Sequence, residues 1–251
     1  MKRCRTFVAA CLFVGATAAH AASTASATID IGSLTVSGAG FTFGLIPATF
    51  FDSSANATDL VTTNSESLVG ANALAMVNAD TWATGSLVGD TLGAFTSAST
   101  FSATASSRFY KAFTITYDTD FGGTVTTTVD YTMSLSDGFA PNPAAPFADV
   151  FANVQLDVWA FDPIPSVSPY NDGDVFVGLA FFGGDLDNAG TLSTEITLPD
   201  LPAGTVLVFA TESSIQVNAV GIAPVPVPPA LALFASAAGL AVVRRRRHSP
   251  R

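Results

Sequence analysis

The stretch Val125-Thr126-Thr127-Thr128-Val129-Asp130-Tyr131-Thr132-Met133-Ser134-Leu135 decides the fold class. Its even-numbered positions are all polar and its odd-numbered positions are mostly apolar. Because this pattern repeats every two residues, alternate side chains would lie on opposite faces of a β-strand. The stretch therefore predicts an antiparallel strand with one buried face and one solvated face, and its many threonines favour the same structure.

The residues just before this stretch alternate in the same way. Phe113, Ile115 and Tyr117 face one side of a strand, and the threonines between them face the other. The intervening residues 118–123 are rich in aspartate and glycine, which are typical of turns. We expect the two strands to form a hairpin.

Further strands are predicted on both sides, separated by segments rich in glycine, proline, asparagine and aspartate. They cover residues 28–36, 39–51, 154–161, 175–182, 192–198, 206–210 and 215–220. The pattern predicts an all-β chain with a single antiparallel β-sandwich, jelly-roll-like or Ig-like, over residues 22–224.

Residues 53–107 differ in composition, because alanine, serine, threonine, asparagine and glycine predominate there. We interpret this segment as irregular strands and long loops. A flexible low-complexity insertion and a short helix at residues 68–77 are the alternatives.

The charge of the predicted sandwich is strongly negative. All 20 acidic residues of the chain fall within residues 22–224, against two basic residues, Arg108 and Lys111, so the formal charge is 2 − 20 = −18. Such a charge argues against nucleic acid or an anionic lipid surface as a partner.

The sandwich also lacks cysteine and histidine. Cys4, Cys11 and His20 precede it, and His248 follows it. Catalysis by Ser-His-Asp or Cys-His groups and metal sites made of histidine or cysteine are thus excluded from this segment. We expect no enzyme activity.

Paired aspartates are the first candidates for a binding site. The best pairs, Asp172 with Asp174 and Asp185 with Asp187, fall in predicted loops. Calcium is bound by such clusters of oxygen ligands, but aspartate also favours turns for conformational reasons alone. No other cofactor is indicated.

Aromatic side chains give the second candidate. Trp159 and Phe161 share one face of a predicted strand, where they could stack on the sugar rings of a polysaccharide. The alternative is packing of this face against the rest of the fold. The carboxylates could also serve a glycoside hydrolase as acid and nucleophile, although no spacing in the sequence indicates a pair.

The N-terminal residues 1–21 have the features of a secretory signal peptide. Basic residues precede a short apolar core, and Ala19-His20-Ala21 forms a small-x-small cleavage site that would leave Ala22 first in the mature chain. The partners implied are the Sec translocon and signal peptidase. A lipoprotein signal with Cys11 as the lipid-bearing residue is the alternative.

The C-terminal residues 225–251 form the third segment. The motif Val225-Pro226-Val227-Pro228-Pro229 overlaps an apolar or small-residue run over residues 227–243, followed by Arg244-Arg245-Arg246-Arg247. A helix of that length spans about 26 Å, at the short end of membrane spans, and the arginines would keep the C-terminus cytoplasmic. A buried helix of a soluble domain and an unprocessed membrane anchor are the alternatives.

A proline-rich motif, an apolar helix and a terminal arginine cluster, in that order, resemble the PEP-CTERM sorting signal of Gram-negative bacteria. The motif is most similar to the VPLPA-CTERM variant, from which Val227 and Pro229 depart. This resemblance implies recognition by exosortase, a membrane cysteine protease–transpeptidase. It also implies transient inner-membrane anchoring, followed by delivery to the cell surface or the extracellular matrix.

The sequence thus predicts an exported, acidic, non-catalytic surface or matrix protein. A carbohydrate-binding or calcium-binding module is the first alternative, and a carboxylate-based glycoside hydrolase is the second.

Overall fold

The chain folds into β-strands throughout the part described by the computed structural model, residues 22–59, 61–99, 101–137, 150–161, 170–179 and 184–221. The side chains of residues 48, 137, 170–179 and 184 lie outside this description. The strands of the described residues are β1 (Ser23–Ser37), β2 (Phe41–Thr58), β3 (Thr63–Val69), β4 (Ala73–Asn78), β5 (Thr81–Val88), β6 (Thr91–Ala98), β7 (Phe101–Tyr117), β8 (Gly123–Asp137), β9 (Val150–Ala160), β10 (Tyr170–Leu179), β11 (Gly184–Leu198) and β12 (Val206–Gly221).

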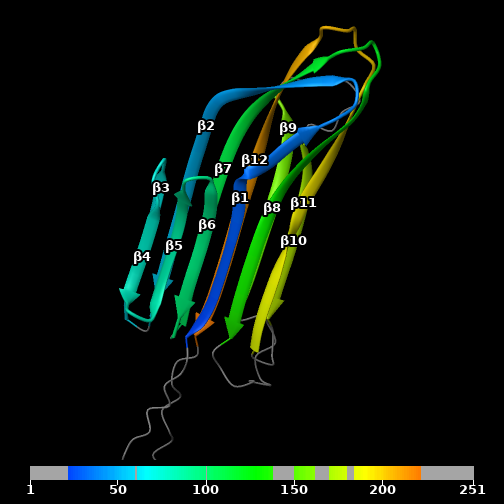
Figure 1. Ribbon diagram of the computed structural model, residues 1–251. Coiled ribbons are helices and arrows are strands. Elements are labelled where there is room, and N and C mark those ends of the chain that lie inside the picture. The colour runs from blue at the N-terminus through cyan, green and yellow to red at the C-terminus, as the bar shows by residue number, and fades with distance from the viewer. Residues whose placement is uncertain are drawn as a thin grey trace, which may run out of the picture.

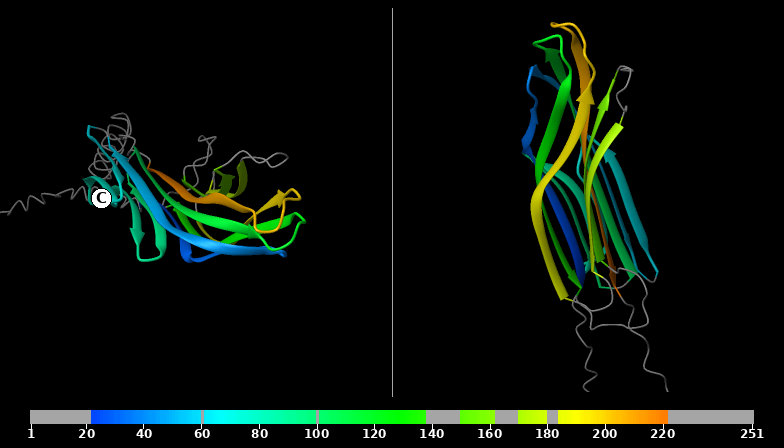
Figure 2. Two further views of the ribbon diagram at one scale, coloured as in Figure 1. Left: turned by 90° about the horizontal axis from the view of Figure 1, so that it is seen from above. Right: turned by 90° about the vertical axis from the view of Figure 1, so that its right-hand side faces the viewer.

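The strands form two antiparallel sheets that stack face to face (Figures 1 and 2). Sheet A has the order β11-β8-β1-β6-β5-β4, and sheet B has the order β10-β9-β12-β7-β2-β3. The prediction of an all-β chain with two packed antiparallel sheets is confirmed.

The stretch that decided the fold class lies in β8, between β1 and β11. Its odd-numbered side chains, from Val125 to Leu135, are buried. Its even-numbered side chains point away from the core, where the Thr132 and Thr28 hydroxyl groups lie 2.7 Å apart. The predicted strand and its buried face are confirmed.

The predicted hairpin of residues 113–135 is wrong, because β7 lies in sheet B and β8 in sheet A. The connection at residues 118–122 crosses between the layers instead. Its aspartates tie it to neighbouring segments: the Asp118 carboxylate accepts a hydrogen bond from Thr42 Oγ1 (2.9 Å), and Asp120 Oδ1 accepts one from the Ala203 N–H (2.8 Å).

The prediction of long loops over residues 53–107 is also wrong, as are the alternatives of a flexible insertion and a short helix. This segment forms the end of β2, all of β3 to β6 and the start of β7. Its small residues are needed inside the sandwich, where Ala55, Ala57, Ala103 and Ala105 are buried between the two sheets.

Two clusters of buried side chains fill the interior. In the larger one, thirteen of 28 buried members are alanines, including Ala25, Ala75 and Ala152. The smaller one consists of nine larger residues, among them Phe41, Phe113 and Phe209. The two clusters thus divide the interior into a small-residue part and a large-residue part.

Both chain ends lie outside the described residues. The predicted signal peptide up to Ala21, its predicted cleavage site and the predicted C-terminal sorting segment, with the motif at residues 225–229 and the arginines at 244–247, are therefore not described. Among the described residues no helix is long and apolar enough to cross a membrane.

Candidate functional site

Aromatic side chains gather on the outer face of sheet B, over β2, β7, β12 and β9. Phe50 on β2 lies opposite Tyr110 on β7, and Trp159 on β9 lies opposite Ala210 on β12. The ring centroids of Phe50 and Tyr110 are 5.5 Å apart, and those of Tyr110 and Trp159 are 6.0 Å apart. These distances are typical of aromatic pairs in contact. The rings therefore form a continuous row across the sheet.

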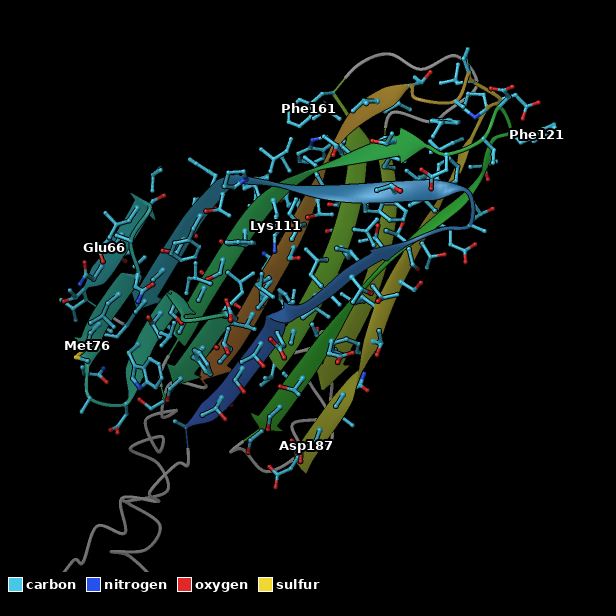
Figure 3. The ribbon with its side chains drawn as sticks, turned by 45° about the horizontal axis from the view of Figure 1, so that its top comes forward. Glu66, Met76, Lys111, Phe121, Phe161 and Asp187 are labelled. Atoms are coloured by element: carbon cyan, nitrogen blue, oxygen red, sulfur yellow. The ribbon has the colours of Figure 1, made fainter. Side chains whose placement is uncertain are left out.

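A pocket of about 240 Å³ lies along this row. It is lined by Thr49, Phe50, Tyr110, Lys111, Ala112, Trp159, Phe161 and Ala210. Ala112 and Ala210 face each other on β7 and β12, and their methyl groups leave room between the larger rings. Phe50 is 46% exposed and Phe161, which is labelled in Figure 3, is 61% exposed, so the pocket presents ring surface to solvent. We call this feature the aromatic pocket.

Charged side chains lie beside the aromatic pocket. The Arg108 guanidinium forms an ion pair with the Glu212 carboxylate, with Nε and Oε1 3.6 Å apart. Glu212 lies opposite Tyr110 on one side and Asp157 on the other. Gln155 Nε2 donates a hydrogen bond of 3.0 Å to Asp157 Oδ1. The neighbours of the pocket therefore form a fixed polar cluster.

Burial governs the protonation of this cluster. It raises the pKa of the Glu212 carboxyl group, Arg108 partly offsets that rise, and Asp157 adds to it. Burial also raises the pKa of Tyr110, and the Glu212 carboxylate raises it further. The Tyr110 hydroxyl thus stays neutral and able to hydrogen-bond at physiological pH.

The two aromatic residues predicted from the sequence, Trp159 and Phe161, both line the pocket. Phe50 and Tyr110 were missed. The signal for Phe50 was available, because Phe50 and Phe51 are adjacent apolar residues and a strand must turn one of them outward. Phe51 is buried, and Phe50 is the residue that faces out.

The predicted loop positions of the aspartate pairs are wrong. Asp172 and Asp174 belong to β10, where they lie opposite Asp157 and Gln155, and their side chains are outside the described set. Asp185 and Asp187 belong to β11, opposite Ser136 and Ser134 on β8. Asp185 Oδ1 accepts a hydrogen bond of 2.6 Å from the Ser136 hydroxyl.

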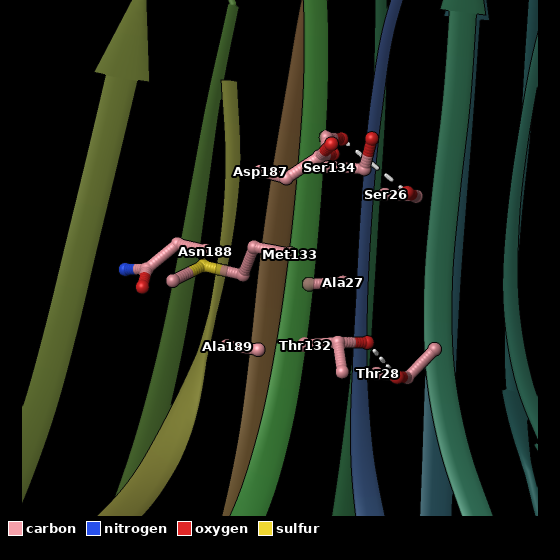
Figure 4. A pocket seen from close by; sticks show the side chains of 9 residues that line it. All are labelled: Ser26, Ala27, Thr28, Thr132, Met133, Ser134, Asp187, Asn188 and Ala189. Atoms are coloured by element: carbon pink, nitrogen blue, oxygen red, sulfur yellow. Dashed lines mark hydrogen bonds between the residues drawn. The ribbon is translucent and has the colours of Figure 1, made fainter.

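Among the side chains that are described, no group of three or more metal-binding residues comes together. Asp187 instead lines a depression of about 370 Å³ over β1, β8 and β11 (Figure 4). Hydroxyl groups there bond within the sheet, as Ser26 Oγ does to the Ser134 carbonyl at 3.3 Å. This depression contains no aromatic ring, so it offers less to a ligand than the aromatic pocket does.

No protein-family model matches the chain, and no curated protein matches it.

Proposed function

We propose that the chain is an exported cell-surface or matrix protein whose β-sandwich binds a polysaccharide through the aromatic pocket. The observation that carries the proposal is the group of rings lining the pocket, of which Phe50 and Phe161 are exposed and Tyr110 and Trp159 are partly buried. Aromatic rings offer flat apolar surface that suits the apolar face of a sugar ring. Such a site fits a carbohydrate-binding sandwich of the jelly-roll-like or Ig-like kind.

The charge of the domain narrows the class of polysaccharide. With 20 acidic and two basic residues over residues 22–224, the protein repels anionic chains at low ionic strength. Arg108 beside the pocket is paired with Glu212, which leaves Lys111 as the one positive charge in the pocket lining against the negative charge of the domain. A neutral polysaccharide is therefore the ligand that we propose.

Binding is favoured over glycoside hydrolysis by the position of the carboxylates. The raised pKa of Glu212 would suit a proton donor, and Asp157 is its cross-strand neighbour. However, Asp157 is 3% exposed, so a sugar cannot reach its carboxylate. Asp157 therefore does not supply the second carboxylate that both the retaining and the inverting mechanism require.

Binding is tested with the full chain and a panel of neutral and acidic polysaccharides, measured by affinity electrophoresis. We expect the Trp159→Ala and Phe161→Ala variants to lose about tenfold or more in affinity for the neutral ligand, because truncation of an aromatic anchor at a binding site costs about 2 kcal/mol or more. Phe121→Ala is the matched control, because Phe121 is 72% exposed in the turn after β7 and lies away from the pocket (Figure 3). Unchanged binding by both pocket variants would contradict the proposal.

The export route rests on the two ends of the sequence. The signal peptide with its Ala19-His20-Ala21 site supports Sec export, and the C-terminal motif, apolar run and arginines support sorting by an exosortase-type transpeptidase. The intact mass of the exported protein tests this route. We expect a chain that begins at Ala22 and lacks Arg244–Arg247; retention of those arginines would leave a simple membrane anchor.

A further inference from the structure

A second pocket of about 240 Å³ lies between the sheets, where β1 and β2 depart from regular pairing. The register of β1 against β8 shifts between Asp30 and Thr35, and that of β2 against β7 shifts between Leu45 and Thr49. A bulge bends its strand locally, so two bulges in neighbouring parts of the layers open a gap. The gap is lined by Leu34, Thr35, Val36, Phe43, Leu45, Lys111, Phe113 and Thr211. We call it the interlayer pocket.

The interlayer pocket lies between the two buried clusters. Leu34 packs against the larger cluster, whereas Val36 and Phe43 pack against the smaller one. The walls are therefore mostly aliphatic and aromatic. Leu45, which is 69% exposed, and Thr35, which is also exposed, form the rim, so the pocket opens to solvent.

Lys111 is the only charged residue in this lining. Phe109 and Phe113 on β7 are buried on the inner face, and strand alternation places Lys111 on the same face. Among the described residues its ammonium group forms no ion pair. Arg108, the other basic residue of the described chain, lies on the outer face and is paired with Glu212.

A partly buried ammonium group beside apolar walls lacks the partner that would offset its desolvation. The carboxylate of a ligand with a short apolar body would pair with the Lys111 ammonium group, and its apolar body would pack against the apolar walls of the pocket. The volume lies below the 300–1,000 Å³ or so of pockets for drug-sized ligands, which limits the body to a short chain or a single ring.

We propose that the interlayer pocket binds a small aliphatic carboxylate, with its head group on Lys111 and its chain between β1 and β2. This site shares Lys111 with the aromatic pocket, but its other walls come from different residues and it takes a different class of ligand. Leu45 lines the interlayer pocket and not the aromatic pocket, so a Leu45→Trp variant distinguishes a carboxylate bound here from one bound in the aromatic pocket.

The test is calorimetric titration of the full chain with octanoate and, in parallel, with uncharged octanamide. We expect saturable binding of octanoate with at least tenfold weaker binding of octanamide, because a hydrogen bond to a charged group is worth at least that factor. Lys111→Met keeps the apolar stem and removes the charge, and we expect it to weaken octanoate binding by about tenfold or more. Arg108→Met, three residues away on the opposite face, is the matched control and should bind octanoate as the wild type does.

Four results would overturn the proposal. The first two are no octanoate binding by the wild type, and an affinity for octanamide equal to that for octanoate. The other two are octanoate binding by Lys111→Met that is as tight as that of the wild type, and a loss of octanoate affinity in Arg108→Met that is as large as that in Lys111→Met. If Lys111→Met does not fold, the Leu45→Trp variant tests the proposal instead, because an indole at the exposed rim would block the entrance of the interlayer pocket. Octanoate affinity that is unchanged in Leu45→Trp would then overturn the proposal.

Discussion

The two parts of the interior hold the sheets together in different ways. In the large-residue part, rings fill the space between the layers: Phe113 stacks on Phe209 with centroids 5.7 Å apart, and Phe41 meets Tyr117 edge to face at 5.0 Å. In the small-residue part, alanines and serines allow the backbones of the two sheets to approach each other. The difference shows that one sandwich can combine ring packing with close contact of its sheets.

Buried serines bond the sheets to each other in the small-residue part. The Ser107 hydroxyl on β7 of sheet B donates to the Gly93 carbonyl on β6 of sheet A at 2.7 Å. The same oxygen accepts a hydrogen bond of 3.0 Å from the Ser86 N–H on β5. Ser53 on β2 likewise accepts from the Ala73 N–H at 2.8 Å. Polar residues that look like loop composition in the sequence therefore act as links between the layers.

Loss of an aromatic ring in the large-residue part should lower the free energy of unfolding more than any other substitution considered below. Phe113→Ala removes a fully buried ring and leaves a cavity, and we expect it to lower the free energy of unfolding by about 3–5 kcal/mol. Chemical denaturation measures the loss. Phe121→Ala, at an exposed position, should change stability by less than about 0.5 kcal/mol. A loss below about 1 kcal/mol in Phe113→Ala would show that the rings do not hold this part together.

Addition of a methyl group in the small-residue part should give the second-largest loss in the free energy of unfolding. A Cβ at Gly85 would lie 2.4 Å from the Ser106 carbonyl oxygen and 2.9 Å from Ser107 Oγ, both on the opposite sheet. Gly85→Ala should therefore destabilise the protein by about 3 kcal/mol, since the backbone of a packed layer must move.

Gly123→Ala is the matched control, because there the closest atom belongs to the Phe41 side chain at 3.3 Å. It should cost less than about 1 kcal/mol, since a ring edge can shift. Equal stability of Gly85→Ala and wild type would show that the sheets are not in close contact at this point.

Loss of a serine link should have a smaller effect. Ser107→Ala leaves the Ser86 N–H and the Gly93 carbonyl without their partner inside the sandwich, and we expect a loss of about 2 kcal/mol. Ser26→Ala, which removes an exposed hydroxyl group bonded to Ser134, is the control and should be nearly neutral. Identical stabilities of the two variants would remove the distinction between inner and outer serines.

The smallest expected change in stability comes from the polar cluster around Glu212 on the outer face of sheet B. The pKa of Glu212 is raised in the folded protein, so the folded state binds this proton more tightly than the unfolded state does. The associated stability is present below the ordinary glutamate value of 4.5 and is lost as the pH rises through the raised pKa. We expect the stability of the wild type relative to Glu212→Gln to fall over that interval and then to level off.

Denaturation curves at several pH values measure this difference. The wild type and Glu212→Gln differ only in this carboxyl group, so the difference between their curves isolates its contribution. A relative stability that rises with pH in the wild type would contradict the raised pKa of Glu212.

The sequence predicted best where alternation was strong. The period of two over residues 125–135 identified the β8 strand and its buried face, because large apolar side chains marked every second position. Over residues 53–107 alternation was equally present, but the inner positions carry alanine, serine and glycine, which do not differ enough in hydropathy from their outer neighbours.

The pairing of strands and the aromatic pocket required long-range information. Nothing local in residues 118–122 distinguishes a crossing between layers from a hairpin, which is why β7 and β8 were paired incorrectly. Trp159 could be selected as an outward-facing ring. However, the rings of Tyr110 on β7 and Trp159 on β9 meet across β12, which lies between these two strands in sheet B. β12 begins more than 90 residues after the start of β7, so nothing local in the sequence indicates this contact.

Tryptophan fluorescence distinguishes a ligand bound at the aromatic pocket from one bound on sheet A, because the described residues contain one tryptophan at the pocket, Trp159, and one on sheet A, Trp82. In Trp82→Phe protein, titration with the neutral polysaccharide identified by electrophoresis should give a saturable change in Trp159 emission. In Trp159→Phe protein, which retains Trp82, the same titration should give none. A change that persists in Trp159→Phe and is absent in Trp82→Phe would place the ligand on sheet A and contradict the account.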